Sequence, residues 1–204
     1  TAMRAPIALV SVIVLAAACS GPKPAEEAAV EAPASVEPEP LDPNAPAAEQ
    51  AALASCGPVT AQGYCGVAFG MTPDAARAKF PAPLQNYSGD TSVQPDPNAC
   101  FELIPAEPVQ GVTFLVEMAK VGRVDIISEA PRTADGFGVG STADDIKAKF
   151  GASVAEAPNK YEHEVMELSV ADGPAKFIFE IQDGKVRAWR AGVMPTIDYV
   201  EHCG

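Results

Sequence analysis

The chain has 204 residues, and its 27 acidic against 14 basic side chains give a formal net charge of −13. A chain this acidic is repelled by the phosphates of nucleic acids and by anionic membrane surfaces, so we expect no nucleic-acid partner. A basic protein partner is compatible with this charge, and the length suits one domain with additional segments.

Residues 1–18 are predicted to be a secretory signal peptide, with translation expected to start at Met3. Arg4 supplies the positive charge near the start. Residues 7–15 form an apolar run that is too short to span a bilayer as a finished helix. Small side chains then lead to Cys19, and we therefore expect an exported bacterial protein.

The segment before Cys19 resembles a bacterial lipobox, although the leucine usual at the third position before the cysteine is Ala16 here. The resemblance implies cleavage before Cys19 and lipidation of its sulfur, so that fatty acyl chains such as palmitate hold the protein at the membrane. Ser20 resembles an outer-membrane sorting signal, so the expected location is the outer membrane, facing the periplasm. The alternative is an ordinary secretory signal that leaves Cys19 free.

Residues 19–54 are rich in proline, alanine and glutamate and hold few large apolar side chains. Such a composition buries too little apolar surface to offset the entropy of ordering, so we predict a disordered tether. We expect this tether to be a solvated spacer, and the alternative is that it docks to a specific partner. The folded domain is then expected to cover residues 55–204.

Two stretches of this domain are related: residues 66–80 read GVAFGMTPDAARAKF, and residues 136–150 read GFGVGSTADDIKAKF. Seven identities at a constant offset of 70 positions indicate a tandem duplication. Thr72 and Thr142 hold N-cap positions and are followed by acidic side chains that suit the helix dipole, so each is predicted to start a short helix. Pro81 and Gly151 are predicted to end these helices.

Each copy continues with apolar or alternating segments that are typical of strands. The predicted strands are residues 100–104, 112–118, 123–127, 165–170, 176–182 and 186–190, with a hairpin turn at Asp183-Gly184. We therefore predict an α+β fold in which two tandem repeats, each a helix on an antiparallel β-meander, form one domain. Repeat one is expected at about residues 66–130 and repeat two at about residues 136–204.

Four further cysteines follow Cys19, and an even number in an exported domain predicts two disulfides. They are Cys56, Cys65, Cys100 and Cys203. Of the three possible pairings we favour Cys56–Cys65, across a short loop with glycine and proline, which leaves Cys100–Cys203. The chain has no CxxC motif of the kind used in zinc or redox sites, and we predict neither a metal nor a cofactor.

The Gly70-Met71-Thr72 motif, followed by a short helix and a meander, resembles two known groups. One is the β-lactamase inhibitory protein, a tandem repeat of helix–sheet units. The other is the SmpA/OmlA-type outer-membrane lipoproteins, single small units that assist β-barrel assembly. The chain from Cys100 to the Tyr-Val-Glu-His-Cys pattern at residues 199–203 also resembles an uncharacterised family of exported proteobacterial proteins. These resemblances imply a fold and an envelope location, and they imply no activity.

No motif indicates catalysis. His163 lies between Glu162 and Glu164, which could offer metal ligands, but adjacent strand residues point to opposite faces and a solvated loop is favoured. There is no GxSxG nucleophile motif, and residues 138–141 lack the lysine of a phosphate-binding loop. We predict that the protein is not an enzyme.

The predicted binding patch centres on Trp189, the single tryptophan, with Arg187, Arg190 and Arg123. An aromatic ring beside guanidinium groups is typical of an interface hot spot or of sugar stacking. The alternative is a buried tryptophan with arginines at its edge.

We therefore predict a non-catalytic, lipid-anchored envelope protein that binds a protein partner through its sheet, as an inhibitor or an assembly accessory. The alternative is a carbohydrate- or peptidoglycan-binding module. That alternative predicts exposed aromatic side chains on the sheet, namely Trp189, Tyr161 and Tyr199.

Overall fold

The structure is a computed structural model that describes residues 51–53, 55–87, 96, 98–106 and 109–203. The predicted signal peptide, the lipidation site Cys19 and the tether up to residue 50 lie outside the described residues. All described residues belong to one compact unit, Leu41–Gly204. Within the described ranges, no helix combines the length and the apolar character needed to cross a bilayer.

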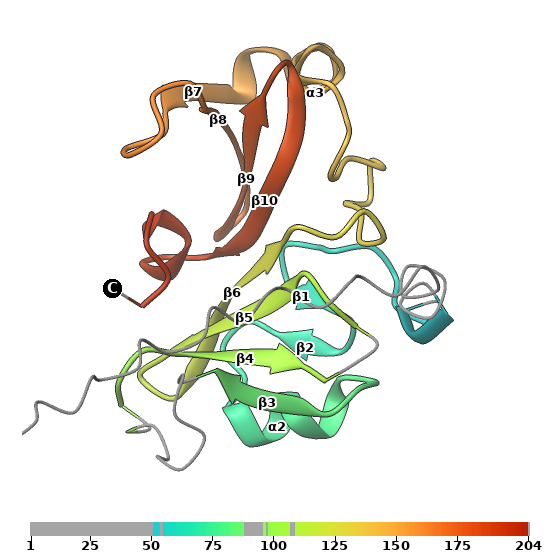
Figure 1. Cartoon of the computed structure of the whole chain (residues 1–204), viewed down its shortest axis with the longest axis vertical. Coiled ribbons are helices and arrows are strands. Elements are labelled where there is room, and N and C mark those ends of the chain that lie inside the picture. The colour runs from blue at the N-terminus through green and yellow to red at the C-terminus, as the bar shows by residue number, and fades with distance from the viewer. Residues whose placement is uncertain (1–50, 54, 88–95, 97, 107–108, 204) are drawn as a thin grey trace, which may run out of the picture. The chain divides into compact units, whose positions relative to one another are not determined.

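Eight strands join in one antiparallel sheet, with the order β3-β4-β5-β6-β10-β9-β8-β7. They are β3 (Leu84–Tyr87), β4 (Phe101–Pro105), β5 (Val112–Glu117), β6 (Lys120–Ile126), β7 (Val154–Pro158), β8 (Met166–Asp172), β9 (Ala175–Gln182) and β10 (Lys185–Val193). The short strands β1 (Gly63–Tyr64) and β2 (Val67–Ala68) form a second sheet. In Figure 1, β4 and β5 cross the view while β9 and β10 rise along it, so the large sheet twists strongly about its centre.

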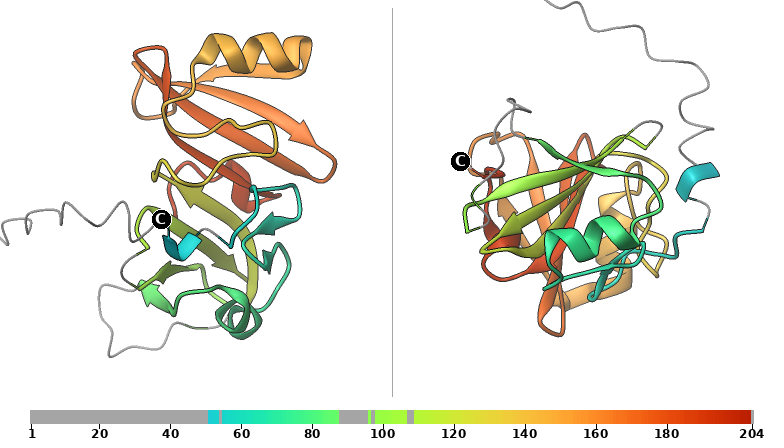
Figure 2. Two further views of the ribbon diagram at one scale, coloured as in Figure 1. Left: turned by 90° about the vertical axis from the view of Figure 1, so that its right-hand side faces the viewer. Right: turned by 90° about the horizontal axis from the view of Figure 1, so that it is seen from below.

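Two α-helices, α2 (Pro73–Lys79) and α3 (Ala143–Phe150), begin after the predicted N-caps. The Thr72 hydroxyl accepts a hydrogen bond from the amide of Ala75 at 3.4 Å. The Thr142 hydroxyl accepts one from the amide of Asp145 at 3.1 Å. The 3₁₀ turn η1 (Gly151–Ser153) follows α3, and η2 (Thr196–Asp198) follows β10. Figure 2 shows α2 and α3 at opposite ends of the unit.

One face of the large sheet, here called the core face, is apolar and carries the hydrophobic core. Phe177 and Phe179 of β9 are buried in this core, and Phe179 stacks on Trp189 with 5.7 Å between ring centroids. Phe80, which follows α2, meets Phe114 edge-on at 5.4 Å. Ile146 of α3 is fully buried in the same cluster, so both helices contribute to one core.

The predicted α+β fold of two tandem helix-plus-meander repeats is wrong. The described chain is mostly β. The two predicted meanders do not form separate units, because β6 pairs with β10 and joins them into one eight-stranded sheet. The helices have only seven and eight residues, too few to form a layer of their own. The repeated sequence marks where these helices begin, but it holds no information on how strands from the two halves pair.

The six predicted strands correspond to β4, β5, β6, β8, β9 and β10, with ends that agree within three residues. The edge strands β3 and β7 were not predicted, because they are short and β7 exposes nearly all its small side chains. Asp183 and Gly184 both have positive φ, as the predicted hairpin turn requires. Residues 51–53 are helical and Leu53 is buried, so the folded body begins before the expected boundary at residue 55.

Candidate functional site

The face of the sheet opposite the core face carries charged side chains that are buried or half-buried, and we call it the polar face. These side chains alternate with core residues along their strands, as in Arg123-Val124-Asp125-Ile126 of β6. The register places Arg190 of β10 opposite Asp125, at the centre of the sheet. The central charged residues are Arg123, Asp125, Glu167, Glu180 and Arg190.

Arginine–carboxylate pairs tie the second half of this face together. Arg190 donates to Glu180 at 3.0 Å and to Glu167 at 3.1 Å. Arg187, at a bulge in β10, binds the other oxygen of Glu180 at 3.1 Å and also reaches Glu162. The hydrogen bond from Arg187 lowers the pKa of Glu162, and the same bond raises the pKa of Arg187. The charges on this part of the sheet are therefore largely neutralised within the protein.

Residues 194–203 follow β10 and cross the polar face. Arg123 donates to the carbonyl oxygens of Thr196 at 2.9 Å and Tyr199 at 2.6 Å, while Arg190 donates to that of Ile197 at 3.2 Å. A Cβ atom at Gly122 would lie only 2.3 Å from the Thr196 hydroxyl oxygen, so glycine is needed for this close approach. The two buried arginines thus bind the main chain of a covering segment.

A pocket of about 510 Å³, here called the central pocket, opens where β6 and β10 separate. The two strands pair only from Trp189 opposite Ile126 to Gly192 opposite Arg123. Aliphatic and charged groups both line the opening, so the pocket offers apolar contact together with hydrogen-bond donors and acceptors. The lining residues are Gly111, Thr113, Asp125, Ile126, Ile127, Glu180, Arg187, Ala188, Trp189, Arg190 and His202.

A second pocket of about 420 Å³, here called the edge pocket, lies around residues 198–203. Tyr199 donates its hydroxyl to both oxygens of Glu117, at 2.9 and 3.0 Å, and this raises the pKa of Tyr199. Tyr161 hydrogen-bonds to Glu201 at the rim. His202 lines both the central and the edge pocket, so it separates the two.

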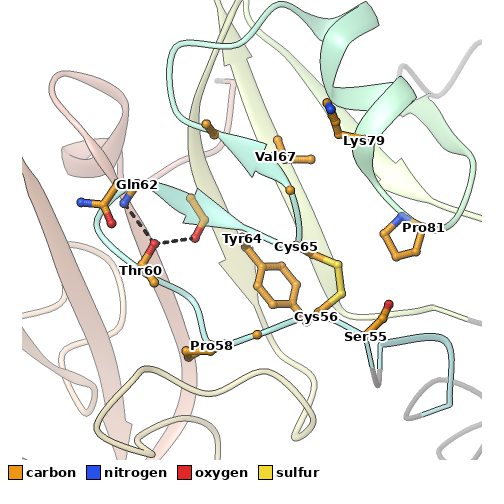
Figure 3. A pocket seen from close by; sticks show the side chains of 14 residues that line it. Ser55, Cys56, Pro58, Thr60, Gln62, Tyr64, Cys65, Val67, Lys79 and Pro81 are labelled. Atoms are coloured by element: carbon orange, nitrogen blue, oxygen red, sulfur yellow. Dashed lines mark hydrogen bonds between the residues drawn. A yellow bond between two sulfur atoms is a disulfide. The ribbon is translucent and has the colours of Figure 1, made fainter.

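Figure 3 shows a third hollow, of about 500 Å³, beside the Cys56–Cys65 disulfide. The Thr60 hydroxyl donates to the carbonyl of Gly63 at 3.3 Å and accepts from the amide of Gln62 at 3.2 Å. Lys79 is the one charged residue in its lining. Because its lining holds a single charged residue, we place the candidate site on the polar face, where several charged side chains meet.

The cysteines form the pairs Cys56–Cys65 and Cys100–Cys203, which is the connectivity favoured from their spacing. The first links the segment before β1 to the β1–β2 turn. The second ties the end of the described chain to the start of β4. Two disulfides in a chain of this size are typical of extracytoplasmic proteins.

The predicted surface patch of Trp189, Arg187, Arg190 and Arg123 is wrong as an exposed patch. Trp189 and Arg123 are 1% exposed and Arg190 is 4% exposed. Trp189 points into the core, where its indole N–H has no hydrogen-bond partner among the described residues. The two buried arginines point to the polar face and are covered by residues 194–203. Only Arg187 remains partly accessible.

The two histidines of the chain lie in different surroundings. His202 contacts Glu102 at 2.5 Å through Nδ1, and this hydrogen bond raises its pKa, which favours the cationic form. His163 is exposed in the loop before β8, and the described residues contain no group of side chains suited to hold a metal ion.

The predictions from sequence missed Asp125, Glu180 and Glu102. One signal could have revealed the covered face: Gly122 lies inside the central strand β6, and glycine inside a strand often marks a close approach of another part of the chain, here Thr196.

No protein-family model and no curated protein matches the chain. Three solved structures share part of its geometry at low similarity. An extracellular protein containing an SCP domain from Bacillus anthracis matches 61% of this chain at 11% identity with a TM-score of 0.44, and the match covers 44% of that protein. The uncharacterised protein YfeY from Escherichia coli matches 67% of this chain at 15% identity with a TM-score of 0.39, and the match covers 99% of YfeY. A DUF4309 family protein, YjgB, from Bacillus subtilis matches 60% of this chain at 13% identity with a TM-score of 0.37, and the match covers 78% of YjgB.

The chain therefore spans less than half the length of the SCP-domain protein. None of the three is described as a β-lactamase inhibitory protein or an SmpA/OmlA-type lipoprotein, so those resemblances stay predictions.

Proposed function

We propose that the chain is a non-catalytic, lipid-anchored protein of the bacterial envelope that binds a protein partner through the polar face. The observation that carries the proposal is the central pocket, where aliphatic walls lie beside donors and acceptors. Arg187 and Arg190 are already neutralised by carboxylates, so the pocket offers little attraction to an isolated charge. A peptide main chain supplies both donors and acceptors, and its side chains suit the aliphatic wall.

The lipid anchor on Cys19, the outer membrane and the periplasmic orientation are part of the same proposal. The lipobox-like sequence before Cys19 and the two disulfides support them. An anchored protein needs no long-range recruitment to a partner in the same membrane, since the anchor raises their effective concentration.

Carbohydrate binding is the weaker alternative. Sugar sites rely on exposed aromatic rings, and Trp189 is buried in the core. Tyr161 is 53% exposed but lies at the edge pocket, and Tyr199 is half-buried with its hydroxyl bound to Glu117.

A site-specific photocrosslinker tests the proposal in intact envelopes that contain the full anchored protein. We place it at Thr113, in the central pocket, and for comparison at the exposed Asp144 of α3. The proposal expects one protein adduct, in near-stoichiometric amount, from position 113 and none from position 144. Equal adducts from both positions contradict it, and an adduct formed only with peptidoglycan supports the alternative.

A further inference from the structure

The covering segment, residues 194–203, is buried at residues 196–197 and exposed at residues 201–203. Thr196 and Ile197 in η2 are 3% and 0% exposed, so they belong to the folded body. Beyond them, Tyr199 and Val200 are half-buried, and residues 201–203 are exposed. We call residues 199–203 the flap. None of its side chains is buried, so hydrophobic packing does little to hold it.

Polar contacts and one covalent bond hold the flap in place. Arg123 donates to the carbonyl of Tyr199, the Tyr199 hydroxyl donates to Glu117, and His202 contacts Glu102. Residues 201–203 are exposed, so solvent competes with the contacts of this end of the flap and weakens them. The Cys100–Cys203 disulfide is therefore the strongest restraint on the flap.

The flap also divides the polar face. Its His202 lines both the central and the edge pocket. If the flap leaves, this shared wall goes with it, and the floor that becomes accessible includes Glu102, Glu117 and Asp125. The side chain of Glu102 is now only 15% exposed. Five of the ten residues that line the edge pocket belong to the flap, so opening replaces that pocket with a strip of the sheet that continues from the central pocket.

We propose that the Cys100–Cys203 disulfide is a redox latch: its reduction by a dithiol opens the flap and creates one continuous groove on the polar face. Opening removes the Tyr199 partner of Glu117 and one of the partners of Arg123, which keeps its bonds to Thr196 and Asp125, so an extended peptide can take the place of the flap at these two residues. This use of the groove rests on the proposed protein-binding function, whereas opening of the flap does not.

The chemistry is thiol–disulfide exchange. A thiolate of the reductant attacks one sulfur of the Cys100–Cys203 bond and forms a mixed disulfide, and its second thiol then displaces the remaining cysteine. Two electrons pass to the protein, the two cysteines take up two protons, and the reductant ends as a disulfide. Cys203 is exposed, so the bond is open to attack from solvent.

The flap is tested by NMR titration of His202 in the folded protein. In the oxidised protein His202 should show a raised pKa from its bond to Glu102. In C100S/C203S the pKa should return to about 6.5, the value of an unperturbed imidazole.

The matched control is C56S/C65S, which removes the other disulfide and should leave the pKa of His202 raised. Should C100S/C203S fail to fold, brief reduction of the folded wild type with dithiothreitol supplies the opened state. If the pKa of His202 is the same in the reduced and the oxidised protein, the proposal of a redox latch is wrong.

Gating of the partner is tested separately with the photocrosslinker at Thr113 in envelopes. The yield of the partner adduct should rise several-fold in C100S/C203S relative to the wild type, and an unchanged yield contradicts gating. If no protein adduct forms with either chain, the proposed function fails, while the His202 titration still decides whether the flap opens.

Discussion

The two disulfides close loops of very different length, which predicts unequal contributions to stability. Cys56 and Cys65 are 9 positions apart, and Cys100 and Cys203 are 103 apart. In the chain-entropy model a cross-link reduces the entropy of the unfolded chain by an amount that grows with the logarithm of loop length. The model gives about 2.6 kcal/mol for the short loop and about 4.7 kcal/mol for the long one.

We therefore expect C100S/C203S to lower the free energy of unfolding by about 2 kcal/mol more than C56S/C65S does. None of the four cysteines is buried, so the serine hydroxyls add little further cost. Equilibrium unfolding in urea, followed through the fluorescence of the single Trp189, measures both variants under identical conditions. The reasoning is refuted if the short-loop variant loses as much stability as the long-loop variant.

Three further outcomes can be measured on the same protein. Gly122→Ala should cost about 1–3 kcal/mol in urea unfolding, because its Cβ would overlap Thr196; a neutral effect contradicts the described approach. The raised pKa of His202 means that its pair with Glu102 stabilises the fold fully below about pH 6.5 and ceases to do so as the pH rises through the folded-state value. The difference in unfolding free energy between wild type and H202Q should therefore shrink with rising pH, and a constant difference contradicts the pair. Ala119→Gly should raise the melting temperature, because Ala119 has a φ of 57° in the β5–β6 turn: relief of about 1–2 kcal/mol of left-handed strain exceeds the added freedom of glycine in the unfolded chain, and a loss of stability would count against that turn.

Local features of this fold could be predicted from sequence because each depends on neighbouring residues. A threonine before a run of helix-forming residues predicts the starts of α2 and α3, and alternation predicts the six longer strands. The cysteine count and spacing lead to the observed pairs. The pairing of β6 with β10 could not be predicted in this way. A strand at the edge of a sheet and a strand inside it can have the same alternation of apolar and polar residues, so the sequence of each half does not show whether its sheet ends or continues.

The burial of the arginines shows the same limit at the candidate site. Alternation along β10 correctly assigns Trp189 and Arg190 to opposite faces, but it does not show which face is covered. The core face is covered by local helices, whereas the polar face is covered by residues 194–203, which a disulfide ties to Cys100 from the far half of the chain. An arginine at the centre of a wide sheet, beside a glycine in the neighbouring strand, is better read as the binding partner of a distant backbone than as a surface charge. Arg123 meets that description, since Gly192 lies opposite it in β10 and its guanidinium donates to the carbonyl oxygens of Thr196 and Tyr199.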